Sequence, residues 1–199
     1  MTLIVGLTGG IATGKSTVTK MFLGIDIPVI ETDEIARDLL KKGTECYQEV
    51  VNAFSKSILL TNGEINRKKL ALIVFANPQR REKLNSIIHP RVKAIVKNEI
   101  EKHKELGTKM IVLDIPLLFE TNFIDLVDKT IVVYTTFPKQ VERLMERERI
   151  DKEYAMLKIS AQMPLDEKVA LADYIIDNSA SILSTKKAFN QIMKELEVL

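Results

Sequence analysis

A short segment near the N-terminus has the residue types and the spacing of a phosphate-binding loop. Residues 9–17 read Gly-Gly-Ile-Ala-Thr-Gly-Lys-Ser-Thr, which fits the pattern G-x-x-x-x-G-K-[ST]. Glycines let successive backbone N–H groups point at an anion, and Lys15 adds a positive charge near the outer phosphates of a nucleoside triphosphate. The hydroxyl of Ser16 can complete the coordination shell of a Mg²⁺ ion. The segment therefore predicts a nucleoside triphosphate site that uses Mg²⁺.

The flanking residues favour this interpretation over a glycine-rich turn that contains Lys-Ser by chance. Four of the eight glycines fall within the first fourteen residues of the chain. Residues 3–7 form a short apolar run that is typical of a buried strand, and Val18, Met21 and Phe22 recur at helical spacing after the lysine. A phosphate-binding loop lies between a strand and a helix N-terminus, so both neighbours fit.

Composition limits the remaining classes of protein. With 199 residues, 46% of them hydrophobic and 28% charged, the chain suits one compact domain with inserted subdomains and is too apolar to be disordered. Its net charge of +2 is too small to indicate a nucleic-acid partner. Cys46 is the only cysteine, which excludes an intrachain disulfide. No signal peptide or apolar run of membrane-spanning length is found, so we expect no membrane partner and a cytoplasmic location.

The elements that must position the loop form an alternating pattern of strands and helices. Besides the first strand, apolar runs predict strands at 25–30, 109–114, 130–134 and 174–177. We therefore expect an α/β fold of the P-loop kinase type, with a five-stranded parallel sheet flanked by helices. The expected division is a core of 1–32, 107–137 and 169–199, a helical acceptor-binding insertion at 33–106, and a helical lid at 138–168.

Two acidic residues follow predicted strands at the edge of the sheet where ligands gather in parallel α/β folds. Asp33 comes after the second strand, where its carboxylate could face the γ-phosphate, but it could equally cap a helix that begins near Glu34. Asp114 ends the third strand, and it could reach Mg²⁺ through water or cap the following turn. Position alone leaves both alternatives open.

The helical insertion is too long for a simple crossover between parallel strands, so it is interpreted as a subdomain that holds a second substrate. Within it, Pro90 is expected to break or kink a helix, because its ring denies an N–H and clashes with the preceding turn. His89 would then lie at a bend. A structural role is favoured for this histidine over a substrate contact.

The most charged part of the chain lies between the fourth and fifth strands. Residues 138–154 are predicted to form one helix, with Arg143 and Arg147 one turn apart. In one interpretation they pair with Glu142, Glu146 and Glu148 on a solvated face. In the favoured one, the helix belongs to a lid whose guanidinium groups neutralise charge on the triphosphate.

Taken together, these motifs and predicted elements resemble those of the dephospho-coenzyme A kinase family over nearly all of the chain. The phosphate loop alone would indicate only a superfamily, but the ordered set of separated motifs is specific. The similar segments are Leu7-Thr8-Gly9-Gly10-Ile11, Asp33 with Ala36-Arg37, Asn66-Arg67, His89-Pro90, Pro116-Leu117-Leu118-Phe119-Glu120, Arg143 with Arg147, Ala161-Gln162, and Ala-Asp-Tyr-Ile-Ile-Asp-Asn at 172–178.

The resemblance implies ATP-dependent phosphorylation of the ribose 3′-hydroxyl of dephospho-CoA, the last step of coenzyme A biosynthesis. It makes Asp33 the favoured general base, beside Lys15 and Arg147 as the other catalytic residues, with Ser16 at the metal. The acceptor-binding residues would be Asp33, Arg37, His89 and Leu117. The ATP-binding residues would be Gly10, Ile11, Ala12, Thr13, Gly14, Lys15, Ser16, Thr17, Arg143 and Asn178. The partners are the two small substrates, and the chain is expected to be a monomer or a weak homo-oligomer.

Departures from the family pattern occur at three places. Ala12-Thr13 replaces a commoner Gly-Ser, and alanine suits the loop if its φ is negative. Ala180 stands where glycine often follows Asn178, and Lys158 replaces an arginine of the lid, so it receives no phosphate role.

Two other functions remain as alternatives. The nearest is a P-loop kinase for another small acceptor, such as a nucleoside monophosphate. A nucleotide-dependent switch is disfavoured because the sequence contains no Asn-Lys-x-Asp guanine-reading motif and no Asp-x-x-Gly switch motif.

Overall fold

The structure is a computed structural model that describes residues 1–197 of the chain. It divides into two compact units. The first contains residues 1–30 and the chain from residue 101 onward, and the second contains residues 31–100. The segment expected as a lid, 138–168, belongs to the first unit. None of the described helices is both long enough and apolar enough to cross a membrane.

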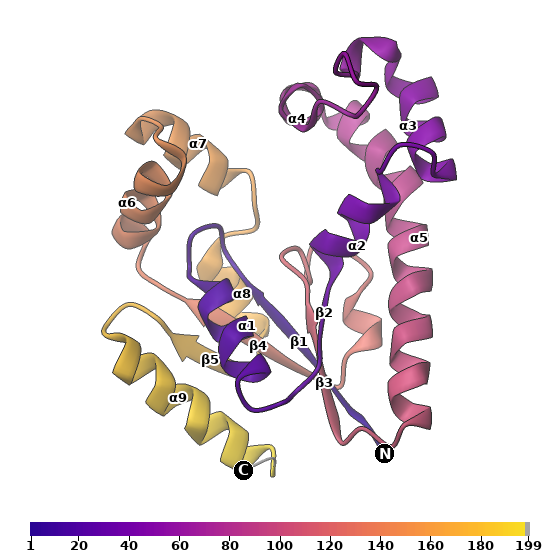
Figure 1. The fold of residues 1–199 in the computed structure, drawn as a ribbon. Helices are drawn as coiled ribbons and strands as arrows, with labels where there is room; N and C mark the ends of the chain where they lie inside the picture. The colour runs from indigo at the N-terminus through magenta and orange to yellow at the C-terminus, as the bar shows by residue number, and fades with distance from the viewer. Residues whose placement is uncertain (198–199) are drawn as a thin grey trace. The chain divides into compact units, whose positions relative to one another are not determined.

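The central element is the predicted five-stranded sheet, with strand order β2-β3-β1-β4-β5 (Figure 1). The strands are β1 (Leu3–Gly9), β2 (Val29–Glu31), β3 (Met110–Asp114), β4 (Lys129–Tyr134) and β5 (Tyr174–Asp177). Parallel pairing joins β1 to both β3 and β4, and β4 to β5. The parallel register brings the carboxyl ends of these strands to one edge, where the phosphate loop leaves β1.

The second strand is shorter than the predicted run of 25–30. The first residues of the predicted run form a turn after α1 (Lys15–Leu23) instead. In this turn the amides of Ile25 and Ile27 both donate to the Phe22 carbonyl at 3.1 Å. Asp26 has a left-handed φ of 58°, so the backbone reaches extended geometry only at Val29. The apolar residues of the turn still pack against the core.

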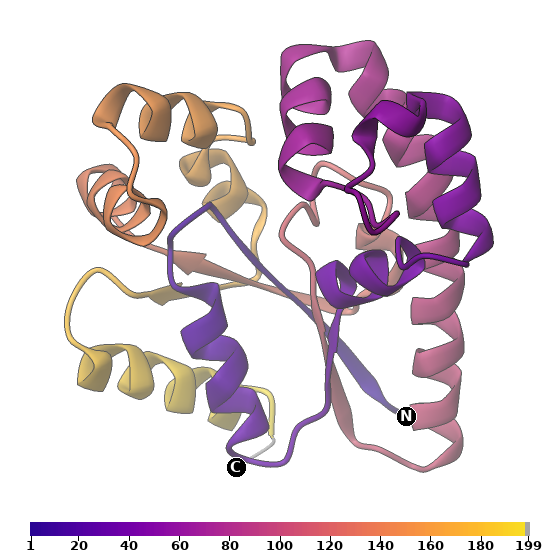
Figure 2. The same cartoon turned by 45° about the horizontal axis from the view of Figure 1, so that its top comes forward.

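Two helices cover one face of the sheet. Figures 1 and 2 show α1 and α9 (Ile182–Glu195) side by side on this face. The rings of Phe22 and Phe189 meet edge to face with centroids 4.8 Å apart, and both are buried among strand residues such as Val5 and Val133. Because interiors are close-packed, this contact fixes the helix on which the phosphate loop ends.

The charged segment expected as one helix at 138–154 is two helices, α6 (Phe137–Glu148) and α7 (Lys152–Ser160), so that prediction is wrong. Arg149 ends α6 with a left-handed φ of 55°. Asp151 then caps α7 by accepting a hydrogen bond from the Tyr154 amide at 2.8 Å. The two helices pack through Val141, Leu144 and Ala155, and the short helix α8 (Leu165–Leu171) follows.

The second unit is helical, as the pattern predicted. It contains α2 (Thr32–Leu39), α3 (Glu45–Phe54), the 3₁₀ turn η1 (Lys56–Ile58), α4 (Arg67–Ala76) and most of α5 (Pro78–Glu105). Tyr47, Val50 and Phe54 of α3 and Ile58 of η1 are buried.

Pro90 does not break its helix, so of the two expected effects, a break or a kink, the break is wrong. Helix α5 runs without interruption from Pro78 to Glu105, so His89 lies inside a helix. Proline denies one intrahelical hydrogen bond, which the Ser86 carbonyl would otherwise accept. Buried side chains on both sides of the proline, among them Ile88 and Val92, offset its penalty.

Candidate active site

The phosphate loop runs from the end of β1 to the start of α1, as predicted. Gly14 is the residue before the helix and has a left-handed φ of 90°, and a Cβ at this position would collide with Asn178 Nδ2. Two reasons therefore require glycine here: the backbone conformation and the close approach of Asn178.

Ala12 differs from the expectation of a negative φ. Its φ is 59°, in the left-handed region, where an L-residue with a Cβ is strained. The commoner glycine of the family pattern would carry no such strain. The side chain of Ala12 packs against the cluster formed by Val141, Leu144 and Ala155, which helps to hold the loop in this conformation.

The N-terminal turn of α1 provides donors for an anion. The first amides of a helix have no intrahelical acceptor, and they lie at the positive end of the helix dipole. These are the amides of Lys15 and Ser16, while Thr17 N donates to the Gly14 carbonyl at 2.9 Å. Earlier in the loop, the amide and the hydroxyl of Thr13 both donate to the Gly10 carbonyl, at 3.3 and 2.9 Å. The first part of the loop thus closes on itself through Thr13.

Lys15 is paired with Asp114 at the end of β3. Its ammonium group donates to Asp114 Oδ1, and Thr19 Oγ1 donates to Asp114 Oδ2 at 2.7 Å. The β1–β3 register brings Asp114 opposite Leu7, two residues before the loop. The Asp114 side chain is 4% exposed, so its charge depends on these partners. A carboxylate that bonds the loop lysine lies within the phosphate site.

The residues present suit a Mg²⁺ ion. Ser16 is exposed in the first turn of α1, and Asp114 lies beside its neighbour Lys15. Mg²⁺ prefers oxygen ligands and is usually held by one or two carboxylates together with waters and substrate phosphates. Accordingly, no group of three or more His, Cys, Asp or Glu side chains in residues 1–197 forms a protein-only metal cage.

Arg143 and Asn178 meet at the far side of the loop. The Thr13 carbonyl accepts hydrogen bonds from Asn178 Nδ2 at 2.8 Å and from Arg143 Nη1 at 3.4 Å. Arg143 Nη2 also donates to the Asn178 carbonyl at 3.0 Å, and Thr185 Oγ1 donates to Asn178 Oδ1 at 3.0 Å. The structure therefore brings these two predicted residues to the loop, through contacts with its backbone.

Arg147 lies one turn further along α6 and is more open to solvent. Its side chain is 56% exposed and donates to Glu148 at 2.9 Å, and Glu148 also pairs with Lys158 of α7. Partial burial alone raises the pKa of Glu148, but the hydrogen bonds from Lys158 and Arg147 bring that pKa below its ordinary value. Pairing within the lid therefore involves Arg147, whereas Arg143 bonds the loop.

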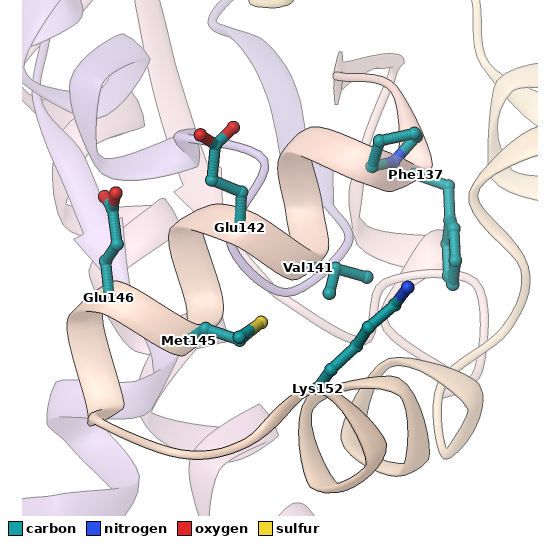
Figure 3. Close-up of a pocket in the computed structure, with 7 residues that line it drawn as sticks. Phe137, Val141, Glu142, Met145, Glu146 and Lys152 are labelled. Atoms are coloured by element: carbon teal, nitrogen blue, oxygen red, sulfur yellow. The ribbon is translucent and has the colours of Figure 1, made fainter.

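The other two glutamates of α6 border a hollow on the outer side of that helix. Figure 3 shows Glu142 and Glu146 projecting to one side of α6, while Met145 and Val141 point to the other side, toward Lys152 of α7. Arg143 and Arg147 are not among the residues that line it. Of the three glutamates expected to pair with the two arginines, Glu148 does so, with Arg147.

Four side chains that received no role from the sequence hold the site together. Gln140 and Gln162 bond the backbone of Ile11, at 2.8 and 2.9 Å. Lys168, which is fully buried, pairs with Glu120 at 2.8 Å and donates to the Pro116 carbonyl at 3.1 Å. Gln162 and Glu120 fall within recognised motifs, but no local pattern pointed to Gln140 or Lys168.

The predicted acceptor residues divide between the units. Asp33 and Arg37 are one turn apart on α2, so they share a face of that helix, and both are exposed. The N-cap position of α2 is Glu31, so the alternative that Asp33 caps this helix is wrong. His89 is half-buried in α5, and burial lowers the pKa of its imidazole. Leu117 belongs to the first unit and is 37% exposed.

Comparison with known proteins gives one consistent family. Residues 3–184 match the family model described as dephospho-CoA kinase. A protein of Geobacillus kaustophilus named dephospho-CoA kinase is 47% identical over 199 residues, covering 100% of this chain and 99% of its own. The solved dephospho-CoA kinase of Campylobacter jejuni superposes with a TM-score of 0.72 at 27% identity, over 98% of both chains. A solved protein of Thermus thermophilus reaches a TM-score of 0.82 at 28% identity, over 98% and 97% of the two chains.

Proposed function

This chain belongs to the dephospho-CoA kinase family, and we propose that the residues around Lys15 and Asp33 carry out its reaction. The reaction transfers the γ-phosphoryl group of ATP to the ribose 3′-hydroxyl of dephospho-CoA. The products are CoA and ADP, and the step is the last of coenzyme A biosynthesis. The observation that carries the proposal is the phosphate loop itself, with Lys15 and Asp114 joined beside the first turn of α1.

ATP binds with its phosphates over the N-terminus of α1. The amides of Lys15 and Ser16 and the helix dipole favour the negative charge there. The Lys15 ammonium exchanges part of its contact with Asp114 for the outer phosphates. Its single charge then acts where negative charge spreads over the transferred group.

A Mg²⁺ ion would be held by the Ser16 hydroxyl and, directly or through water, by the Asp114 carboxylate. When bound it neutralises charge on the phosphate oxygens. The protein side chains, in addition to holding the ion, keep the triphosphate in the orientation required for transfer.

The second unit binds dephospho-CoA in this proposal. Asp33 accepts the proton of the 3′-hydroxyl as the general base, and Arg37, one turn later on α2, binds an anionic group of the acceptor. His89, neutral at pH 7 because burial lowers its pKa, and Leu117 of the first unit complete the acceptor contacts.

Residues 138–168 act as the lid over ATP. Arg143 supports the loop through the Thr13 carbonyl and lies beside Asn178, where the adenine would be bound. Arg147 is the more exposed arginine of the pair, so its guanidinium is the one available to stabilise charge in the transition state. The protein works in the cytoplasm as a monomer or weak homo-oligomer, which light scattering of the purified chain tests.

An acceptor panel tests the proposed substrate. ATP, Mg²⁺ and one acceptor at a time, either dephospho-CoA or a nucleoside monophosphate, are followed by coupled ADP release. We expect ADP and CoA to form in equal amounts with dephospho-CoA alone. Turnover of a nucleoside monophosphate in place of dephospho-CoA would establish the alternative kinase instead.

A further inference from the structure

One residue of the phosphate loop, Ile11, is held on both sides of its Cα by two glutamines that come from opposite ends of the lid segment. Gln140 Nε2 donates to the Ile11 carbonyl at 2.8 Å, and the Ile11 amide donates to Gln162 Oε1 at 2.9 Å. Gln140 is in the second turn of α6, and Gln162 follows α7. An amide nitrogen can only donate and a carbonyl can only accept, so the orientation of both side-chain amides is determined by their partner.

The surrounding contacts leave this arrangement little freedom. Gln140 is 3% exposed, and it lies so close to the loop that a Cβ at Gly10 would be 2.6 Å from its Nε2 atom. The backbone N–H of Gln162 donates to the Ile159 carbonyl at 3.2 Å, which fixes the main chain that carries this side chain. A buried side-chain amide that lost its partner would leave unsatisfied polar atoms, so the hydrogen bond is expected to persist.

Apolar packing connects the same part of the loop to the same helices. The side chains of Ile11 and Ala12 pack against the cluster formed by Val141 and Leu144 of α6 and Ala155 of α7. The first half of the loop therefore contacts the lid helices through both its backbone and its side chains. Its second half, from Lys15, belongs to α1.

We propose that Gln140 and Gln162 are positioning residues for phosphoryl transfer, which fix the two peptide units on either side of the Ile11 Cα and thereby make the shape of the phosphate loop depend on the lid. Neither side chain touches ATP in this inference. They act through the loop backbone, because a change at the backbone of Ile11 shifts Ala12, Thr13 and the donors that follow. The inference deepens the proposed function and depends on it, since ATP is taken as the ligand of the loop.

Paired substitutions at the two positions give opposite expectations. Gln162→Glu keeps an oxygen that can accept from the Ile11 amide, whereas Gln162→Met removes it. Gln140→Glu replaces the donor by an oxygen that faces the Ile11 carbonyl, and Gln140→Met only removes the donor. We therefore expect Glu to be better than Met at position 162 and no better than Met at position 140.

The readouts are the KM for ATP, the KM for dephospho-CoA, and hydrogen exchange of the amides of residues 10–14. Loss of one such hydrogen bond is expected to raise the KM for ATP about 3- to 10-fold, with the KM for dephospho-CoA unchanged and faster exchange in the loop. Gln191→Met is the matched control, because Gln191 is exposed on α9 and its side chain donates to Glu195 of the same helix at 2.9 Å. It should change none of these quantities.

Two results would overturn the inference. One is an unchanged KM for ATP and unchanged loop exchange in both Met variants, even if their melting temperatures fall. The other is the same ranking of Glu and Met at both positions. Hydrogen exchange reports the contact between the glutamines and the loop without requiring turnover. If the wild-type protein were inactive with dephospho-CoA but the variants showed the expected change in exchange, the proposed function would be contradicted and the contact would still be supported.

Discussion

The ammonium group of Lys15 donates to the carboxylate of Asp114, which joins the phosphate loop to the end of the neighbouring strand β3. Thr19, one turn into α1, donates to the second oxygen of the same carboxylate at 2.7 Å. The lysine that is expected to neutralise ATP is thus held in place before ATP binds. The same contact orients the carboxylate that is expected to serve Mg²⁺.

Replacing Lys15 with alanine should remove activity and reduce stability for two separable reasons. The lost charge should lower turnover by at least about 10³-fold. The Asp114 carboxylate, 4% exposed, would lose its cation, which should reduce the free energy of unfolding by about 1–3 kcal/mol. Turnover is measured by ADP release and stability by urea unfolding.

A second change separates the two effects. The double variant Lys15→Ala with Asp114→Asn should regain part of the stability, because the unpaired buried charge is gone. It should remain inactive. An active Lys15→Ala protein would contradict the phosphate site.

Asp33→Asn tests the general base. The amide cannot accept the hydroxyl proton, so kcat should fall about 10²- to 10⁴-fold, while the affinity for ATP stays near that of the wild type. Asp38→Asn is the matched control on the same helix, since Asp38 is exposed and pairs with the nearby Lys41 at 2.7 Å. Near-normal turnover of Asp33→Asn would show that Asp33 is not the general base.

Ala12→Gly should stabilise the protein, which is unusual for a change to glycine. The φ of 59° strains an alanine, and relief of that strain should exceed the entropic cost of glycine, for a net gain of up to about 1 kcal/mol. The matched control is Ala161→Gly, whose φ is −76°, and which should lose about 0.5–1 kcal/mol. Thermal unfolding should show shifts of opposite sign, and equal losses in both variants would refute the strain at Ala12.

His89 should titrate below its ordinary pKa of 6.5, because burial disfavours the imidazolium. A lowered native pKa means that its contribution to stability is full above pH 6.5 and is lost as the pH falls through the native value. Nuclear magnetic resonance can follow the titration, and a His89→Gln variant assigns the signal among the two histidines. A midpoint at or above 6.5 would show that the imidazole is not desolvated.

The sequence predicted most of the fold because its apolar runs report burial directly. Four of the five strands lie where runs such as 109–114 predicted them, and the second is confined to Val29–Glu31. The loop motif specified its own strand and helix. Helix ends were harder to place. Arg149 ends α6 by a left-handed backbone that no residue type demanded, and Pro90 stays within α5 because packing outweighs a local penalty.

The site was predicted only in part, because residues in local motifs can be found from the sequence and contacts between distant segments cannot. Lys15, Gly14, Arg143 and Asn178 follow recognised motifs, and the structure joins them around Thr13 and Asp114. The contact of Gln162 with Ile11 spans 151 residues of sequence and depends on the packed positions of two helices. Nothing in the neighbourhood of either residue could have indicated it. The φ of Ala12 is likewise set by its packing against the lid cluster.

The most direct test is a crystal structure with a non-hydrolysable ATP analogue, Mg²⁺ and dephospho-CoA. We predict that the β- and γ-phosphates lie against Lys15 and the amides of Lys15 and Ser16, with the 3′-hydroxyl of the acceptor between the γ-phosphate and Asp33. Phosphates bound elsewhere, or an acceptor whose 3′-hydroxyl lies away from Asp33, would contradict the account.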